Sequence, residues 1–143
     1  MVMDGEALKE RHLLPIRVYY EDTDFSGIVY HASYLRFMER GRTELLRARG
    51  ISQIQLAEGS YGDACAFVVR DMKIDFLRPG RMDDELLIET TIESVGGASV
   101  SLNQRVLRED TILVTAAVRL AVIGSNGRAK ILPPPLMAVL TGR

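Results

Sequence analysis

The hydrophobic positions of the chain follow two different periods along its length, and the first of these predicts helices. Within Tyr34–Ala48 the apolar residues recur every three or four positions, and arginines and glutamates occupy much of the remaining surface, as in an amphipathic helix. Ser33 is expected to be the N-cap of this helix, and Gly50 its C-terminal stop. A short second helix is predicted for Ser52–Glu58, which begins with a capping-box pattern.

The second period is an alternation of apolar and polar residues, which indicates strands. One such run precedes the long helix, and four follow it with turn residues between them. Pro133–Pro135 excludes a helix interior or a central strand, and a short terminal helix is expected from Leu136. The predicted strands are Leu14–Glu21, Met72–Phe76, Leu86–Val95, Val100–Val106 and Ile112–Val122.

These elements predict an α+β fold in which a curved antiparallel sheet of five or six strands wraps around one long helix. Short hairpin connections make neighbouring strands antiparallel, and the apolar face of the helix has only the sheet to pack against. Gly41 lies within that apolar face, which suggests a close approach of helix and sheet. Several apolar residues alternate with the core-facing residues of their strands and are therefore expected on the face of the sheet away from the helix. They indicate oligomer contacts through the sheet or its edge: Leu87, Leu113, Ala117, Ala121 and Ile123.

Composition narrows the class of protein further. The 143 residues fit one domain, 1–143, in which 1–13 is expected to be a loosely ordered N-terminal segment. Eighteen Lys and Arg against 19 Asp and Glu give a net charge of −1, which indicates no nucleic-acid partner. The longest uncharged stretch has 12 residues, too few for a membrane span. A single cysteine, Cys65, forms no internal disulfide, and a cytoplasmic location is expected.

Candidate chemistry is concentrated in the segment Tyr19–Glu39, where carboxylates, hydroxyl groups and an imidazole lie between a strand end and a helix start. A carboxylate at Asp24 would lie near the N-terminus of the helix, whose free N–H groups favour negative charge. That combination suits attack on a carbonyl carbon, or activation of water for it. A Ser26–His31–Asp24 triad also remains open, because triads are defined by geometry rather than by sequence order.

Structural roles are the alternative for each of these residues. Asp22, Thr23 and Asp24 are common turn formers, His31 fits a helix-capping position, and Glu39 fits a solvated helix surface. Motifs for zinc, dinucleotides and phosphate loops are not found in the sequence. Spacing alone therefore leaves the chemistry undecided.

Two motifs resemble those of the hotdog-fold acyl-CoA thioesterases. The resemblance is nearest to the 4-hydroxybenzoyl-CoA thioesterase type and its branch encoded beside the Tol-Pal envelope system, and it covers about 16–131. The second motif, Asp75–Leu86, is similar to the turn between two central strands of that family. The first motif is Tyr20-x-x-x-Asp24-x-x-Gly27-Ile28-Val29-Tyr30-His31-x-x-Tyr34-x-x-Phe37-x-Glu39.

The resemblance implies roles for five residues. Asp24 corresponds to the catalytic aspartate, which acts as nucleophile or as general base. His31 lies where the aliphatic-acyl branch keeps histidine, so it would orient the reacting groups and favour aliphatic acyl chains. Tyr30 and Tyr34 would shape the substrate pocket, and Glu39 would support substrate binding. The resemblance also implies a homodimer or homotetramer with active sites at the subunit interface.

The predicted function is hydrolysis of short- to medium-chain acyl-CoA by an enzyme that needs no metal or prosthetic group. The alternatives are hydrolysis of acyl-carrier-protein thioesters, a non-catalytic acyl-binding or scaffolding module, and a dehydratase on the same fold. The oxyanion donor is expected either at the helix start near His31 or within Tyr61–Ala66. The basic residues Arg70, Lys73, Arg78, Arg81 and Arg105 are candidates for the CoA phosphates, with solvated strand faces as their alternative.

Overall fold

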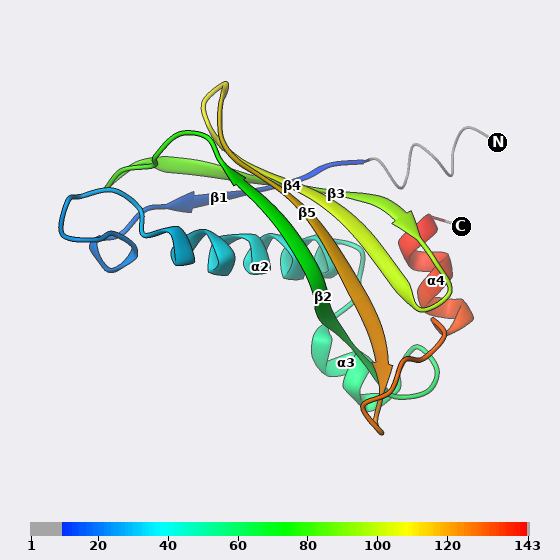
Figure 1. Cartoon of the computed structure of the whole chain (residues 1–143). Helices are drawn as coiled ribbons and strands as arrows, with labels where there is room; N and C mark the ends of the chain where they lie inside the picture. Colours follow the sequence, from blue (N-terminus) through cyan, green and yellow to red (C-terminus); the bar gives the residue numbers. More distant parts are fainter. Residues whose placement is uncertain (1–9, 143) are drawn as a thin grey trace.

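A curved antiparallel sheet is the framework of the computed structural model, which describes residues 10–142 (Figure 1). Its five strands are arranged in the order β1-β3-β4-β5-β2, and every neighbouring pair is antiparallel. Strand β2 therefore forms one edge and β1 the other. The strands are β1 His12–Arg17, β2 Cys65–Phe76, β3 Glu85–Val95, β4 Ser99–Arg108 and β5 Thr111–Gly124.

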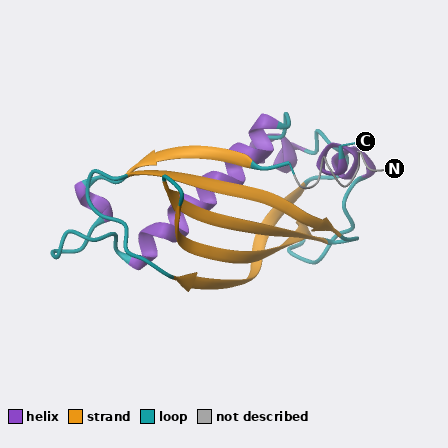
Figure 2. Cartoon of the chain, turned by 90° about the horizontal axis from the view of Figure 1, so that it is seen from above, coloured by secondary structure: helices purple, strands orange, loops and turns teal. Residues whose placement is uncertain are grey.

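One long helix, α2 (His31–Ala48), lies along the concave face of the sheet (Figure 1) and crosses behind the strands in the view from above (Figure 2). A 3-10 turn, η1 (Tyr20–Asp22), precedes it, and two short helices, α3 (Gln53–Glu58) and α4 (Pro134–Thr141), follow. The helix buries Phe37, Met38 and Leu45 against the sheet, as its apolar face predicts. The predicted α+β hotdog architecture is confirmed, with five strands.

Gly41 marks the closest approach of α2 to the sheet. A Cβ atom at this position would lie 2.7 Å from Ile88 Cγ2 and 3.0 Å from Thr90 Oγ1. Real Cβ contacts are longer, so only glycine fits here without displacing its neighbours. The expectation that Gly41 allows a close helix–sheet contact is confirmed.

The N-terminal elements differ from the sequence prediction in two ways. Strand β1 ends at Arg17 instead of Glu21, because the chain turns into η1, where Tyr20 is exposed. His12 and Leu13, expected in a loose segment, belong to β1 and pair with Thr90 and Glu89. Residues 1–9 lie outside the described part of the chain.

Two other boundaries and one burial prediction also change. Strand β2 begins at Cys65, seven residues before the predicted start at Met72. The sequence pattern missed this part of the strand because a bulge between Val69 and Asp71 breaks the alternation of apolar and polar residues. Helix α4 begins at Pro134 rather than Leu136, since proline is tolerated in a first helical turn. Leu113, predicted to face away from the core, is fully buried.

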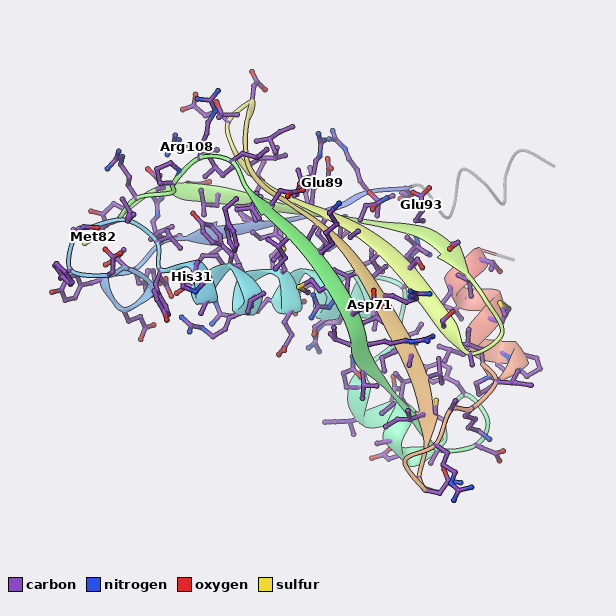
Figure 3. All side chains as sticks on the ribbon, viewed as in Figure 1. His31, Asp71, Met82, Glu89, Glu93 and Arg108 are labelled. Carbon is purple, nitrogen blue, oxygen red and sulfur yellow. The ribbon has the colours of Figure 1, made fainter. Side chains whose placement is uncertain are left out.

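Polar interactions on the outer face of the sheet centre on Glu89, which lies on the side away from α2 (Figure 3). Its carboxylate accepts hydrogen bonds from Arg105 Nε at 2.6 Å and from Arg11 Nη1 at 2.9 Å. The Arg105 hydrogen bond, assisted by Arg11, holds the pKa of Glu89 below its ordinary value although burial opposes the shift. The ionised carboxylate therefore stabilises the folded chain.

We expect Glu89→Gln to lower the free energy of unfolding by about 1 kcal/mol at neutral pH, because both partner arginines keep considerable solvent contact. A carboxyl whose pKa is lowered on folding stabilises above its unfolded pKa and loses this effect as pH falls through the folded value. The difference from wild type should therefore shrink in urea unfolding performed well below pH 4.5, the ordinary glutamate pKa. Glu85→Gln, on the same strand but exposed, is the control; an equal, pH-independent loss in both variants would contradict the assignment.

Candidate active site

The loop before α2 is held in place by the buried carboxylate of Asp22. Its Oδ2 accepts a hydrogen bond from the Tyr19 N–H at 2.8 Å, and its Oδ1 forms an ion pair with Arg36 of α2 at 3.2 Å. The Asp22 carbonyl accepts from the Tyr30 N–H at 2.9 Å and from the Ser33 hydroxyl at 3.0 Å. Asp22 thus ties the loop to the helix start rather than serving only as a turn former.

Asp24 lies further along this loop and is half-buried. Its Oδ1 accepts hydrogen bonds from both the hydroxyl and the backbone N–H of Ser26, the latter at 2.8 Å. These two bonds lower the pKa of Asp24 from its ordinary value of 3.8, and the bond from the Ser26 hydroxyl has the larger effect. A backbone hydrogen bond from Ile28 contributes to the same shift. The site therefore has an ionised carboxylate that its own loop holds in position.

Helix α2 begins at His31, with Tyr30 at the N-cap and no side-chain cap. This corrects the prediction of Ser33 as N-cap: Ser33 is already inside the helix, and its hydroxyl bonds to the Asp22 carbonyl instead. The N–H groups of His31 and Ala32 have no partner within the described chain. The helix start thus presents two backbone donors that can stabilise a developing oxyanion.

A mainly apolar pocket of about 260 Å³ lies beside this helix start, near the end of the molecule where His31 is labelled in Figure 3. The Tyr34 hydroxyl fixes one wall by accepting a hydrogen bond from the Gly80 N–H at 2.8 Å. The ring of Phe76 lies 6.2 Å from that of His31 and 5.9 Å from that of Tyr34. The pocket is called here the thioester pocket, after the substrate class that the sequence resemblance implies. Its lining residues are Ile28, Val29, His31, Tyr34, Phe76, Leu77, Arg78 and Pro79.

We expect Tyr34→Phe to lower the free energy of unfolding by about 1–2 kcal/mol, since the buried Gly80 N–H would lose its acceptor. Chemical denaturation of the purified variant measures this. Tyr20→Phe, at a tyrosine that is 78% exposed, should leave stability unchanged. A Tyr34→Phe protein as stable as wild type would show that the Gly80 N–H finds another acceptor.

A second pocket, called here the Arg42 pocket, lies further along the same helix. It has a volume of about 290 Å³ and brings Glu39 and Arg42 of α2 together with Phe67 and Val69 of β2. The predicted site residue Glu39 therefore lies in a different pocket from His31 and Tyr34. The complete lining is Glu39, Arg42, Thr43, Leu46, Gln53, Phe67, Val69 and Leu120.

The five residues singled out from the sequence are thus only partly brought together. His31 and Tyr34 line the thioester pocket. Tyr30 is half exposed and its ring contacts that of His31 at 4.6 Å. Asp24 shares a loop with two pocket residues but is not itself in the lining. No Ser26–His31–Asp24 triad is formed, because the Ser26 hydroxyl donates to Asp24 and His31 bonds to neither.

Comparison with known proteins identifies the class. The family model of the thioesterase superfamily matches residues 26–115 of the chain. The fold and the pocket beside the start of α2 are consistent with this family. The chain belongs to the thioesterase superfamily. The sequence-based resemblance to this class of enzyme is thereby confirmed.

Particular relatives are also similar over most of the chain. The acyl-CoA thioesterase YbgC of Haemophilus influenzae is 44% identical over 76% of this chain and 78% of its own length. The acyl-CoA thioester hydrolase YbgC of Escherichia coli is 46% identical with the same shares covered. The structure of a probable thioesterase from Bartonella henselae has a TM-score of 0.83 and 46% identity, covering 87% of this chain and all of that one.

Within residues 10–142, no group of three His, Cys, Asp or Glu side chains could hold a metal ion. No helix in the same part of the chain is long and apolar enough to cross a membrane.

Proposed function

We propose that this thioesterase hydrolyses short- to medium-chain aliphatic acyl-CoA to the free acid and CoA, with the carboxylate of Asp24 as the reacting group. The observation that carries the proposal is the ionised carboxylate beside an apolar pocket and the uncapped start of α2. Relatives named as acyl-CoA thioesterases support CoA as the leaving group.

In the proposed reaction the thioester carbonyl oxygen accepts hydrogen bonds from the N–H groups of His31 and Ala32. Asp24 acts in one of two ways. As a general base it takes a proton from water, whose oxygen attacks the carbonyl carbon while the carbon–sulfur bond breaks. As a nucleophile it forms a mixed anhydride that water then hydrolyses. Either route yields the carboxylic acid and the CoA thiol, because the departing thiolate takes up the proton.

The aromatic residues position the acyl group in this proposal. His31 contacts Tyr30 and Phe76 and lines the thioester pocket, so it orients the reacting groups. Tyr34 fixes one wall through its hydrogen bond with Gly80. An apolar lining with few polar side chains suits an aliphatic chain near the thioester.

We further propose that the active enzyme is a homodimer, itself able to pair into a homotetramer, with sites at the subunit interface. Strand β2 is a long edge strand with no neighbour on its outer side among the described residues, and Val68, Val69 and Phe76 on it are exposed. Unpaired edges of this kind readily add another strand. Antiparallel pairing with a second β2 would bring the partner's Tyr61–Ala66 segment toward the thioester pocket, whereas within one chain that segment lies at the other end of β2.

A panel of acyl-CoA substrates, with free thiol release as the readout, tests the activity directly. Maximal turnover of short- to medium-chain aliphatic acyl-CoA is expected, with benzoyl-CoA and the matching acyl-carrier-protein thioesters turned over more slowly. Faster turnover of the carrier-protein thioesters would show that acyl carrier protein, rather than CoA, is the preferred leaving group. Saturable binding with no turnover of any thioester would show an acyl-binding module instead.

A further inference from the structure

The Arg42 pocket contains a nearly buried guanidinium with unused hydrogen-bond donors. Arg42 is 9% exposed, and its Nη1 donates to Gln104 Oε1 at 3.0 Å. No carboxylate of residues 10–142 forms an ion pair with it. The only fully buried side-chain nitrogen or oxygen without a partner in this part of the chain is Nδ1 of His12. The remaining N–H groups of Arg42 are therefore not sealed off in the core, and Arg42 lines the pocket.

A network inside the core fixes the guanidinium in place. The Gln104 amide nitrogen donates to the Met38 carbonyl and to Thr90 Oγ1, each at 2.9 Å, so its oxygen is turned toward Arg42. Burial lowers the pKa of Arg42, and Glu39 partly opposes this shift. A desolvated guanidinium is costly unless acceptors surround it. A hydrogen-bond acceptor on a ligand in the pocket would pair with the Arg42 N–H groups that have no acceptor among the described residues.

The other residues of the pocket restrict the chemistry of that acceptor. Glu39, also in the lining, contributes a carboxylate, so the two charged side chains sum to zero. A ligand carboxylate would face repulsion from Glu39, and a plain hydrocarbon would leave both groups unpaired. A hydroxyl accepts from Arg42 and donates to Glu39. Phe67, Val69 and Leu120 supply apolar surface for the attached carbon chain.

The position of the pocket relates it to the proposed reaction. Arg42 follows His31 by 11 positions on α2, which corresponds to about 16 Å along a helix axis. Both pockets are lined by α2 on one side and by β2 on the other. We propose that the Arg42 pocket binds a hydroxyl group at the far end of the substrate's acyl chain, with Arg42 and Glu39 as specificity-determining residues; this rests on the proposed acyl-CoA hydrolysis.

The test compares decanoyl-CoA with ω-hydroxydecanoyl-CoA by free thiol release from the full-length protein. Wild type should favour the hydroxylated substrate in kcat/KM by about tenfold, the effect of one well-formed hydrogen bond to a charged group. Arg42→Met should lower kcat/KM for the hydroxylated substrate about tenfold more than for decanoyl-CoA. Glu39→Gln, at an exposed position, should reduce the preference without affecting folding. Arg40→Met, on the exposed side of the same helix, is the matched control and should keep the wild-type preference.

The outcomes separate this inference from the proposed function. Hydrolysis of decanoyl-CoA without a preference for the hydroxylated substrate would overturn the hydroxyl site and leave the proposed function intact. A wild-type preference that survives in both Arg42→Met and Glu39→Gln would also overturn it. Arg42→Lys keeps a buried cation and is the second variant, to be used if Arg42→Met does not fold. The ratio of kcat/KM for the hydroxylated substrate to kcat/KM for decanoyl-CoA is then compared between Arg42→Lys and wild type. Hydrolysis of neither substrate would contradict the proposed function itself.

Discussion

Replacing Asp24 by Asn is expected to lower kcat for acyl-CoA hydrolysis by about 10³-fold, within the range for loss of a general acid–base group. Asparagine keeps the size of the side chain and can still accept the Ser26 hydrogen bonds through its amide oxygen. It supplies neither a negative charge nor a basic oxygen at Oδ2. The loop should therefore keep its conformation while the reacting group is lost.

Glu93→Gln is the matched control for this variant. Glu93 is also a carboxylate that accepts a side-chain hydrogen bond, in its case from Asn103 at 2.9 Å. It lies on β3 and lines neither the thioester pocket nor the Arg42 pocket, so its variant should keep wild-type kcat. Equal losses in both variants would indicate a general electrostatic effect instead of chemistry at Asp24.

Replacing Gly41 by Leu is expected to lower the free energy of unfolding by about 3 kcal/mol, at the upper end of the usual cost of overpacking. The added Cβ alone would lie 2.7 Å from Ile88 and 3.1 Å from the amide nitrogen of Gln104. The side chain would also displace the network that positions Arg42. Urea unfolding at neutral pH measures the loss.

Ala48→Leu introduces the same side chain on an exposed turn of the same helix and should change stability by less than about 0.5 kcal/mol. A Gly41→Leu protein as stable as this control would show that the helix can move away from the sheet at little cost.

Local patterns were sufficient to predict most of the fold. The three- and four-residue spacing gave α2, and the left-handed backbone of Gly50, with φ +82°, ends it as expected. The hairpins after β3 and β4 follow from their turn residues. The start of β2 could not be predicted, because the bulge near Arg70 shifts the alternation by one residue.

The sequence predicted the candidate site only where its residues belong to one short, continuous motif. His31 and Tyr34 line one pocket as the motif implies. Whether Asp24 meets the substrate depends on geometry that local sequence does not encode. Arg42 was missed because an arginine on an amphipathic helix is ordinarily solvated. Its spacing of four residues from Met38 and three from Leu45 places it on the buried face, and this signal could have identified it.

The most direct test of the central claim, that the carboxylate of Asp24 carries out thioester hydrolysis, separates binding from chemistry in Asp24→Asn. The Kd for decanoyl-CoA and single-turnover cleavage with enzyme in excess are measured on the same preparation. The account predicts a Kd within a few-fold of wild type and a cleavage rate lowered about 10³-fold. Cleavage at the wild-type rate, or a loss explained entirely by weaker binding, would contradict it.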